Sequence, residues 1–491
     1  MNHFSSLFLI AVLVLLLGCG GCGESAPTGA LVLTQAPTGP TGTAAATDIL
    51  DVRYPSGSRV VLALPPFQPG SVRVLSKGLI SAGSPIVSLD GRRVFFAGKA
   101  GAAATWQIYE ARPGGGTPKQ ITDMPGGAMD PALIATGDLV FSSPVPKAGE
   151  SWKPARPSAL YAQSPGGSPR RLTFGSASAV ELTVLADGRI LFVSAQPVAT
   201  NGSEPHLALF TVNDDGTEVT AFAGQHDGAA FVHRPRELGH GRVGFLASNP
   251  DSATNEIWAE SVRTARPFTS RGRLFQFQAG RCRSVEPGEE GALLASFDSR
   301  GVMGRSMRGS QAIFQVGPEA QVLGQPLFDD PSWDDIEAAR LAPRPKPTGH
   351  ISTMVAAKKT GTILCLDANR TSDRAADGGN PSVATRIRVL SETEQGVLRA
   401  LGEVELQPDG SFLAEVPADV PLGFEALDAH GNVLRRLPPM VWVRAGENRS
   451  CLGCHEPHNR SPRNARPLAV NFPPARLGAP LETVAMQSPR P

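Results

Sequence analysis

The stretch Ser84–Gly98 (SPIVSLDGRRVFFAG) contains a short strand, a turn at Asp90-Gly91 and a second, more apolar strand. Its apolar residues recur with a period of two, which indicates strands rather than helices. The same unit recurs downstream at Asp130–Ser143 (DPALIATGDLVFSS), Glu181–Ala195 (ELTVLADGRILFVSA), Arg234–Ser248 (RPRELGHGRVGFLAS) and, more weakly, Gly288–Asp298 (GEEGALLASFD). The aromatics that anchor the unit are 45, 51, 53 and 52 residues apart, at Phe96, Phe141, Phe192, Phe245 and Phe297. The chain is therefore a repeat protein with a period of about 50 residues.

A second strand pair lies between successive units. It carries an aromatic residue and a Gly-rich turn, and the aromatics are 52, 49 and 48 residues apart, at Tyr109, Tyr161, Phe210 and Trp258. Four strands in each period predict the blades of a β-propeller. With Arg53–Leu64 as one more outer pair, we expect five or six blades over residues 49–342, and we favour six. The D-G-R/K turn before an apolar strand resembles the WD40-like repeats of TolB-type propellers, which indicates a fold but little about function.

The proline-rich stretch Pro343–Pro347 predicts a stiff junction between two domains. Beyond it, short alternating strands are separated by turns at Asp409-Gly410 and His430-Gly431. We expect a small antiparallel β-sandwich over residues 348–445, which makes the chain all-β. A last segment follows over residues 446–491.

Composition narrows the function classes. At 491 residues the chain is long enough for two or three domains, each with its own core. The net charge is +1, so no nucleic-acid partner is expected. Gly and Pro together make 97 residues while hydrophobics make 41%, which favours many tight turns between short strands. The sequence contains no Gly-rich phosphate loop, no G-x-S-x-G elbow and no H-E-x-x-H motif.

The N-terminus indicates export. Residues 7–17 (LFLIAVLVLLL) are an apolar run of the length of a signal-peptide core. The run leads into Leu16-Leu17-Gly18-Cys19, which looks like a bacterial lipobox, although no Lys or Arg precedes the core. We expect a signal peptide over 1–18, lipidation of Cys19 rather than Cys22, and a flexible tether over 19–48. The protein would then be anchored on the periplasmic side of a bacterial membrane.

The sequence Cys451-Leu452-Gly453-Cys454-His455 is a Cys-x-x-Cys-His motif, the attachment sequence of c-type haem. Two thiols three positions apart in a tight turn each reach one vinyl group of one porphyrin, and the adjacent imidazole ligates the iron. A disulfide, half of a zinc site and chance are the competing interpretations. We favour one covalent haem c, which makes residues 446–491 a haem-binding segment and tail. Attachment outside the cytoplasm agrees with export. The last 31 residues are rich in Pro and Arg and cannot form a helical cup around the haem, so the sandwich, the propeller rim or a partner would cover it.

The iron ligands are predicted only in part. His455 is the expected axial ligand, and His458, Met440 and Met486 are candidates for the sixth position, as is a vacant or water-filled site. A Met or a second His would make an electron carrier. An open iron would permit ligand binding or peroxidase-like chemistry.

For several other residues, a functional role competes with an ordinary structural role. Cys282 and Cys365 could bridge propeller and sandwich, or Cys282 could approach the haem, but two buried thiols are the simpler expectation. His226 and His233 could line the propeller mouth or be structural, and Glu456 could contact a propionate or be solvated. The acidic residues Asp329, Asp330, Asp334 and Asp335 are expected in a solvated loop.

The C-terminal part resembles the haem-carrying middle domain of the hydrazine synthase alpha subunit. The resemblance rests on Pro408–Phe412, on Val416–Leu422 with Leu427-Asp428, and on Gly446–Glu456 (GENRSCLGCHE), and Gly361–Asp367 fits the opening strand. It implies an exported, multihaem-associated redox protein with a six-bladed propeller before the haem domain. A tyrosine that serves the iron in that family is Asn459 here, and this sequence has one Cys-x-x-Cys-His rather than two. We therefore do not expect hydrazine synthase activity.

Three functions follow as hypotheses. The first is a membrane-tethered monohaem cytochrome that passes electrons to a redox protein partner. The second is an oxidoreductase with an open haem iron that acts on a small nitrogen or oxygen compound. The third is a propeller that serves as a binding module, with a structural haem.

Overall fold

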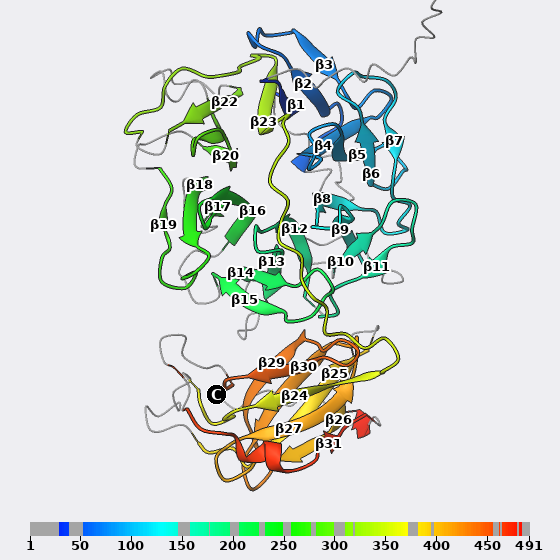
Figure 1. Ribbon diagram of the computed structural model, residues 1–491, viewed down its shortest axis with the longest axis vertical. Helices are drawn as coiled ribbons and strands as arrows, with labels where there is room; N and C mark the ends of the chain where they lie inside the picture. The colour runs from blue at the N-terminus through cyan, green and yellow to red at the C-terminus, as the bar shows by residue number, and fades with distance from the viewer. Residues whose placement is uncertain are drawn as a thin grey trace, which may run out of the picture.

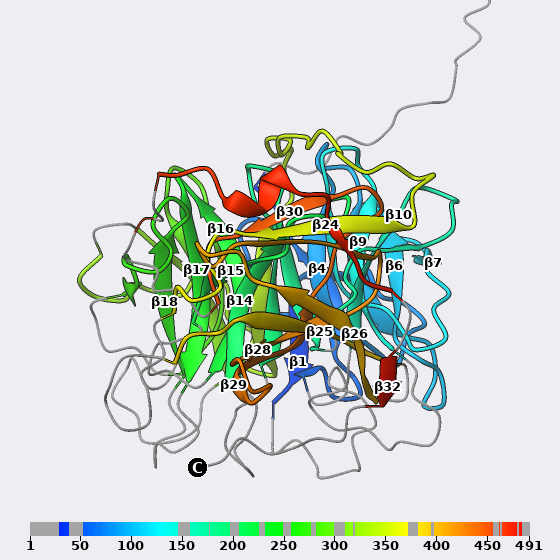
Figure 2. The ribbon, with the colours of Figure 1, turned by 90° about the horizontal axis from the view of Figure 1, so that it is seen from below.

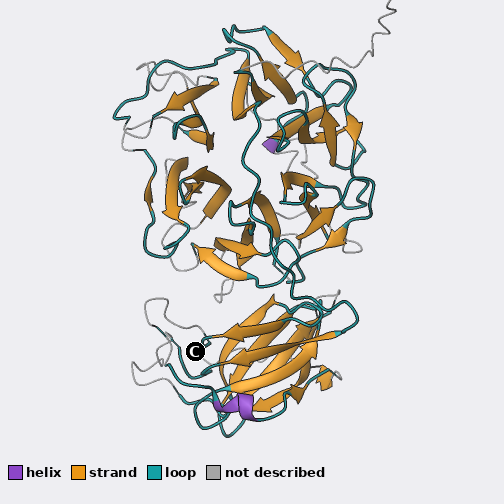
Figure 3. Ribbon diagram, in the orientation of Figure 1, coloured by secondary structure: helices purple, strands orange, loops and turns teal. Residues whose placement is uncertain are grey.

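A computed structural model describes residues 29–38, 53–145, 158–175, 177–196, 206–224, 231–248, 257–275, 281–298, 310–317, 320–371, 382–393, 397–454, 461, 464–478 and 481–483. Two all-β bodies lie side by side, a ring of radially arranged sheets and a two-layered sandwich (Figure 1). Strands dominate throughout, joined by short loops (Figure 3). The prediction of a propeller followed by a sandwich is confirmed.

Six sheets form the propeller, so the expectation of six blades is confirmed for the described residues. Blade 1 contains β23 (Trp333–Arg340), β1 (Leu31–Pro37), β2 (Arg59–Ala63) and β3 (Val72–Val74). Blade 2 contains β4 (Ser81–Val87), β5 (Val94–Lys99), β6 (Gln107–Ala111) and β7 (Lys119–Gln120). Blade 3 contains β8 (Met129–Leu133), β9 (Leu139–Pro144), β10 (Ser158–Gln163) and β11 (Arg170–Arg171).

The remaining blades follow the same order from the axis outward. Blade 4 contains β12 (Ala179–Val184), β13 (Ile190–Gln196), β14 (His206–Val212) and β15 (Thr220–Ala223). Blade 5 contains β16 (Phe231–Gly239), β17 (Arg242–Ser248), β18 (Ile257–Arg263) and β19 (Gly272–Arg273). In blade 6 three strands pair, β20 (Cys282–Pro287), β21 (Leu293–Asp298) and β22 (Gln311–Val316).

Blade 1 closes the ring with strands from both ends of the propeller sequence. Strand β1 pairs with β2 on one side and with β23, about 300 residues later, on the other. All residues of β1 except Pro37 are buried. The predicted flexible tether over 19–48 is therefore wrong for residues 31–37, because Leu31, Val32 and Leu33 supply an apolar strand that the closing blade buries.

The repeated aromatics pack as neighbours on adjacent strands. Phe96 lies opposite Tyr109, Phe141 opposite Tyr161 and Phe192 opposite Phe210. The ring centroids of these pairs are 6.3, 6.0 and 6.2 Å apart. Rings at this separation stabilise the sheet beyond their buried area. In blades 2, 3 and 4 the period of about 50 residues is thus the spacing of one cross-strand aromatic pair per blade.

Charged residues line the axis of the propeller. In five blades one residue of the innermost strand has a positive φ, between 49° and 58°, at a break in the strand register: Ser84, Asp130, Glu181, Arg234 and Glu337. Each such β-bulge turns a polar side chain toward the axis. The backbone N–H of Glu181 donates to Asp130, that of Arg234 to Glu181, and that of Ser84 to Glu337. Hydrogen bonds from the backbone N–H of a bulge residue to a carboxylate of the adjacent blade therefore connect neighbouring blades around the axis.

The sandwich has two sheets that enclose one core. One sheet orders β30 (Asn448–Cys451), β24 (Thr360–Cys365), β27 (Phe412–Pro417) and β31 (Ala475–Arg476). The other orders β29 (Val433–Val441), β28 (Leu422–Leu427), β25 (Arg386–Glu392), β26 (Leu398–Glu405) and β32 (Leu481–Thr483). Figure 2 shows the two layers edge-on. Within the predicted range 348–445 the strands pair antiparallel, and two strands beyond it add parallel pairs at the rims, β30 with β24 and β31 with β27.

The linker between the two bodies crosses one face of the propeller (Figure 1). The N–H of Arg344 donates to the carbonyl of Leu89 at 3.0 Å, and the N–H of Thr348 donates to that of Ala186 at 2.8 Å. Gly188, in the turn between β12 and β13, has a φ of 90°, and a Cβ there would lie 2.1 Å from the Thr348 carbonyl oxygen. This turn needs glycine both for its left-handed backbone and for the close approach of the linker.

Helical structure plays a small part in the described residues. A 3₁₀ helix, η1 (Leu468–Asn471), packs beside β27, where the N–H of Leu468 donates to Asp409. Across the residues that the structure describes, no helix has the length and hydropathy needed to cross a membrane.

Candidate haem site

The first cysteine of the Cys-x-x-Cys-His motif ends strand β30 at the rim of the sandwich. Cys451 lies opposite Cys365 of β24 in parallel register, and its carbonyl accepts the N–H of Leu366 at 2.9 Å. Its side chain is half-buried and packs against the sandwich core. The motif is therefore continuous with a sheet rather than carried on a free tail.

The second cysteine is held by a different loop. The backbone N–H of Cys454 donates to the carbonyl of Arg370 at 3.1 Å, and the Arg370 guanidinium donates to the carbonyl of Ser461 at 2.8 Å. Cys454 is also half-buried, and Leu452 between the cysteines is 40% exposed. Both ends of the turn are thus fixed while its apolar middle faces outward.

The remaining predicted ligands fall mostly outside the described residues. These are His455, His458 and Met486, together with Glu456, Asn459, His226 and the lipidation candidate Cys19. Among the described residues, no three His, Cys, Asp or Glu side chains are grouped so as to hold a metal ion. The iron ligands therefore stay predictions.

The strand that carries Cys451 is fastened to the propeller. Trp442 is buried among residues of blades 3 and 4, and its indole N–H donates to the carbonyl of Gly216 at 2.8 Å. Arg444 donates to the carbonyl of Asp215 at 2.7 Å, pairs with Asp419 of the sandwich at 2.7 Å and lies over the ring of Phe174. We call Trp442, Arg444, Glu447 and Arg449 the interdomain latch.

Glu447 is the polar centre of the latch. Its carboxylate accepts the N–H of Arg444 at 2.7 Å within the sandwich segment and the N–H of Glu218 at 2.9 Å across the interface. Burial raises the pKa of this carboxyl, while the two N–H groups oppose the rise. Arg449, two residues before Cys451, donates to the carbonyl of Val219 on blade 4. The propeller therefore fixes the position of the cysteine-bearing strand.

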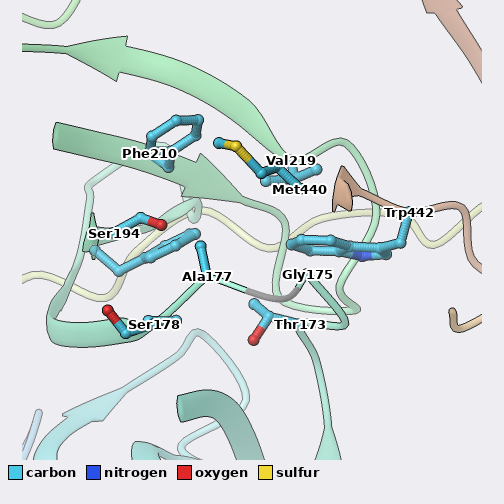
Figure 4. Close-up of a pocket in the computed structure, with 11 residues that line it drawn as sticks. Thr173, Gly175, Ala177, Ser178, Ser194, Phe210, Val219, Met440 and Trp442 are labelled. Atoms are coloured by element: carbon cyan, nitrogen blue, oxygen red, sulfur yellow. The ribbon is translucent and has the colours of Figure 1, made fainter. Parts of the chain in front are cut away.

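Met440 lies in the domain interface. It lines a pocket between blades 3 and 4 and the sandwich, with Phe192, Phe210, Val219 and Trp442 (Figure 4). The enclosed volume is about 20 Å³, room for one water molecule. Neither cysteine lines this pocket, so the structure does not bring Met440 and the motif together there.

The two remaining thiols do not bridge the domains. Cys282 is buried in the core of blade 6 and Cys365 in the core of the sandwich, and neither forms a disulfide. Burial raises the pKa of Cys282 to about 12 and raises that of Cys365. The simpler expectation of two buried thiols is confirmed.

The structure also places His233 and the predicted acidic loop. His233 is part of the axial network, with its Nδ1 3.4 Å from a carboxylate oxygen of Glu181. The predicted solvated acidic loop is wrong for Asp330 and Asp335, which are buried, the latter in β23. Asp335 accepts the side-chain N–H of Gln35 at 2.9 Å, and burial raises its pKa to about 8.

The residues at the motif fit a covalently bound haem. Two half-buried cysteines stand three positions apart in a turn whose ends are held by β24 and by Arg370, and the apolar Leu452 projects between them. Thioether formation needs such accessible thiols, and a porphyrin face needs apolar neighbours.

Comparison with known proteins adds to this geometry. Residues 357–456, which span β24 to the cysteine turn, match the family model of the hydrazine synthase alpha subunit middle domain. The chain is similar to the hydrazine synthase alpha subunit. The curated hydrazine synthase subunit alpha of Kuenenia stuttgartiensis is 22% identical over 519 residues, which cover 82% of this chain and 63% of that protein. This chain thus spans less than two thirds of the length of that relative.

The fold similarity extends beyond the matched domain. The solved structure of Kuenenia stuttgartiensis hydrazine synthase superposes with a TM-score of 0.75 at 18% identity, over 90% of this chain and 71% of that chain. TolB from Acinetobacter baumannii matches with a TM-score of 0.43 at 12% identity, over 64% of this chain and 67% of that chain. The match to the hydrazine synthase structure covers both the propeller and the sandwich of this protein.

Sequence reasoning found the cysteines but missed the residues that position them. Cys365 is expected from the sequence either as a partner for Cys282 or as a buried thiol, and its place beside Cys451 is not predicted. The sequence signal for the latch is the segment 442–449, in which one Trp, two Arg and one Glu immediately precede the motif. Nothing in the sequence indicates that their partners are backbone carbonyl and N–H groups of blades 3 and 4.

Proposed function

We propose that this protein is an exported monohaem c-type cytochrome that transfers electrons to or from a protein partner. The observation that carries the proposal is the half-buried Cys451–Cys454 turn, which ends a strand of a domain that matches the hydrazine synthase alpha middle domain. Cys451 and Cys454 would hold the haem by thioethers, and His455 would ligate the iron. A haem so placed supplies a one-electron redox couple.

The protein residues hold and shield this group. The sandwich rim and the Arg370 loop fix the two attachment points, and the latch sets the strand against the propeller. Exposed Leu452 leaves one side of the turn open to a partner. An attachment site at a rim suits electron transfer, because a partner protein can approach it without opening a cavity.

Membrane anchoring is part of the proposal. The apolar run 7–17 and the lipobox-like sequence before Cys19 support export and diacylation of that thiol. The cytochrome would then act on the outer side of a bacterial inner membrane or the inner side of an outer one. Mass spectrometry of detergent-extracted protein tests this, since acylation adds two fatty-acid chains at Cys19.

The pyridine haemochrome spectrum of the full chain, expressed with a c-type haem attachment system, tests the central claim. One haem per chain with the band position of two thioethers is expected, and a Cys451→Ala, Cys454→Ala double variant should carry none. Cys282→Ala, which removes a thiol from the core of blade 6, is the matched control and should keep its haem. Exported, folded wild-type protein without haem would overturn the proposal and leave a propeller-based binding module.

A second function is favoured by one observation. Met440 lines the propeller interface rather than the motif, so one of the three candidate side chains for the sixth iron position lies elsewhere. An open iron would suit an oxidoreductase that acts on a small nitrogen or oxygen compound. Carbon monoxide and cyanide titrations separate the two functions: a low-spin haem indifferent to both supports the carrier, and a high-spin haem that binds them supports the enzyme.

A further inference from the structure

We propose that Cys365 is a third thiol of the haem-attachment site and forms a disulfide with Cys451 in the exported chain before haem is attached. The proposal rests on the proposed function for its biological meaning. The disulfide itself depends only on the geometry of β24 and β30. Its effect would be to make haem attachment depend on the redox state of the compartment.

The two cysteines are direct neighbours across two paired strands. Cys365 lies opposite Cys451 in parallel register, and the N–H of Leu366 donates to the Cys451 carbonyl at 2.9 Å. Adjacent strands are about 4.8 Å apart. Disulfides join residues whose Cα atoms are about 4.4–6.8 Å apart, so no backbone movement is needed to reach this range.

Their side chains also share one face of the sheet. Along β24 the buried positions are Gly361, Ile363 and Cys365, while the residues between them are half-exposed. Cys365 belongs to the sandwich core, and Cys451 packs against that same core. The Cβ atoms therefore project to the same side, as a bridge between paired strands requires.

Cys454 competes for the same sulfur. Cys451 and Cys454 stand three positions apart in the chain, so Cys454 is a second thiol that can form a disulfide with Cys451. Cys451 can form one disulfide at a time. A bond to Cys365 leaves Cys454 as a thiol, whereas a bond within the motif removes both attachment points at once.

Oxidised glutathione would supply the oxidant. The Cys451 thiolate attacks one of its sulfurs, forms a mixed disulfide and releases one glutathione thiolate. The Cys365 thiolate then attacks the Cys451 sulfur and releases the second. Two protein thiols lose two protons and two electrons, and one glutathione disulfide becomes two thiols. Because burial raises the pKa of Cys365, the second step should be slow and should speed up as pH rises.

The consequence for maturation follows from the chemistry of attachment. A thioether forms only from a thiol, so Cys451 in a disulfide with Cys365 cannot bond to a haem vinyl group. Reduction must then precede attachment. Cys365 is only 3% exposed, so a reductant would reach its sulfur slowly. A disulfide through Cys365 should therefore persist longer than one between Cys451 and Cys454.

The test maps disulfides in full-length, haem-free protein produced without a haem attachment system. The protein is incubated with oxidised glutathione, alkylated under denaturing conditions and digested, and the peptides are analysed by mass spectrometry. The expected product is a peptide pair linked through Cys365 and Cys451, lighter than the two reduced peptides by two hydrogens. Cys365→Ser should abolish this pair and give the Cys451–Cys454 link instead, and Cys282→Ser should change neither.

Haem yield provides a second readout. In cells that attach haem, Cys365→Ser should need less added reductant than wild type for full haem loading, and Cys282→Ser should match wild type. A Cys365 that stays alkylatable at every glutathione concentration would overturn the proposal, and this result needs no variant to fold. The outcome is separate from the proposed function, because the link is mapped in protein without haem and a missing haem would not affect it.

Discussion

Glu181 is a single buried carboxylate on which three elements of the propeller converge. It pairs with Arg53 and with His233, and it accepts the backbone N–H of Arg234 at 2.8 Å. Its side chain is 6% exposed, so little water replaces these partners if they are lost. The charges of the axial network are therefore interdependent, and removing one leaves others buried without compensation.

We predict that Glu181→Gln lowers the free energy of unfolding by about 3–5 kcal/mol at pH 7, the cost typical of breaking a buried ion pair. Although burial alone would raise the Glu181 pKa, the positive charge of Arg53 and the contact with His233 hold it well below its ordinary value. Its stabilisation is thus present above the unfolded pKa of about 4.3 and is lost as pH falls below it. Urea unfolding at pH 7 and pH 4 should show a smaller acid-induced loss in the variant than in wild type.

Glu403→Gln is the matched control for this prediction. Glu403 also pairs with two arginines, Arg386 and Arg388, but its side chain is 31% exposed. Exposed pairs contribute about 0–1 kcal/mol. If both variants lose the same free energy, the axial network has no special role in stability.

The positions of these residues were visible in the sequence, but their role was not. Ser84, Asp130, Glu181 and Arg234 are the first residues of the recurring units, so the repeat already aligned them. Their left-handed backbone and their direction toward the axis depend on β-bulges, which strand periodicity does not reveal. The same limit explains the cysteine site, where the motif predicted the thiols but not the neighbour Cys365 on β24.

At the scale of elements, the closing strand β1 is the most consequential. It pairs on both sides and supplies buried apolar residues to the first blade. We predict that a chain beginning at Gly39 loses cooperative thermal unfolding, because β2 and β23 would then both present open edges. A chain beginning at Gly29 keeps β1 and should unfold as the wild type does, which thermal unfolding followed by circular dichroism can measure.

Sequence periodicity predicted five of the six blades directly but misplaced this strand. Residues 31–37 (LVLTQAP) are short and stand apart from the repeat, among Gly, Ala, Thr and Pro. Their partner β23 lies about 300 residues away, and no local pattern indicates a pairing at that separation. Long-range register is the information that a single sequence lacks.

The linker crossing makes a separate prediction at Gly188. Gly188→Ala should destabilise more than Gly137→Ala, although both glycines have a positive φ, 90° and 86°. An added Cβ meets nothing within 4 Å at Gly137 but lies 2.1 Å from the Thr348 carbonyl at Gly188. The backbone term alone costs about 1–2 kcal/mol, and the linker must shift only in Gly188→Ala. Equal melting temperatures for the two variants would show that the linker does not rest on this turn.

At the scale of the molecule, the latch joins two bodies that each have a core. Trp442 is 3% exposed and contacts blades 3 and 4. We predict that Trp442→Ala costs about 3–5 kcal/mol, typical of truncating a buried aromatic residue. It should also split a single calorimetric transition into two, because the domains would unfold with less coupling. Trp258→Ala, within blade 5 and partly exposed, is the control and should keep one transition.

The domain order was predictable, whereas the contact between domains was not. Repeat spacing gave the propeller and alternating short strands gave the sandwich, and the structure confirms both. The latch depends on backbone groups of Arg171, Asp215, Gly216, Glu218 and Val219, whose side chains carry no signal for it. Contacts to backbone atoms leave almost no trace in side-chain identity.

The position of β1 near the N-terminus limits the distance between the propeller and a bilayer to which Cys19 would be attached. With the first strand at Leu31, eleven residues separate it from Cys19. At about 3.3–3.6 Å per residue, a segment of this length spans roughly 40 Å at most. A protein attached there through acyl chains would hold its closing blade close to the lipid headgroups. The sandwich that carries the cysteine turn packs on blades 3 and 4, across the ring from that blade (Figure 1), so a redox partner would meet it on the side of the molecule remote from the attachment point.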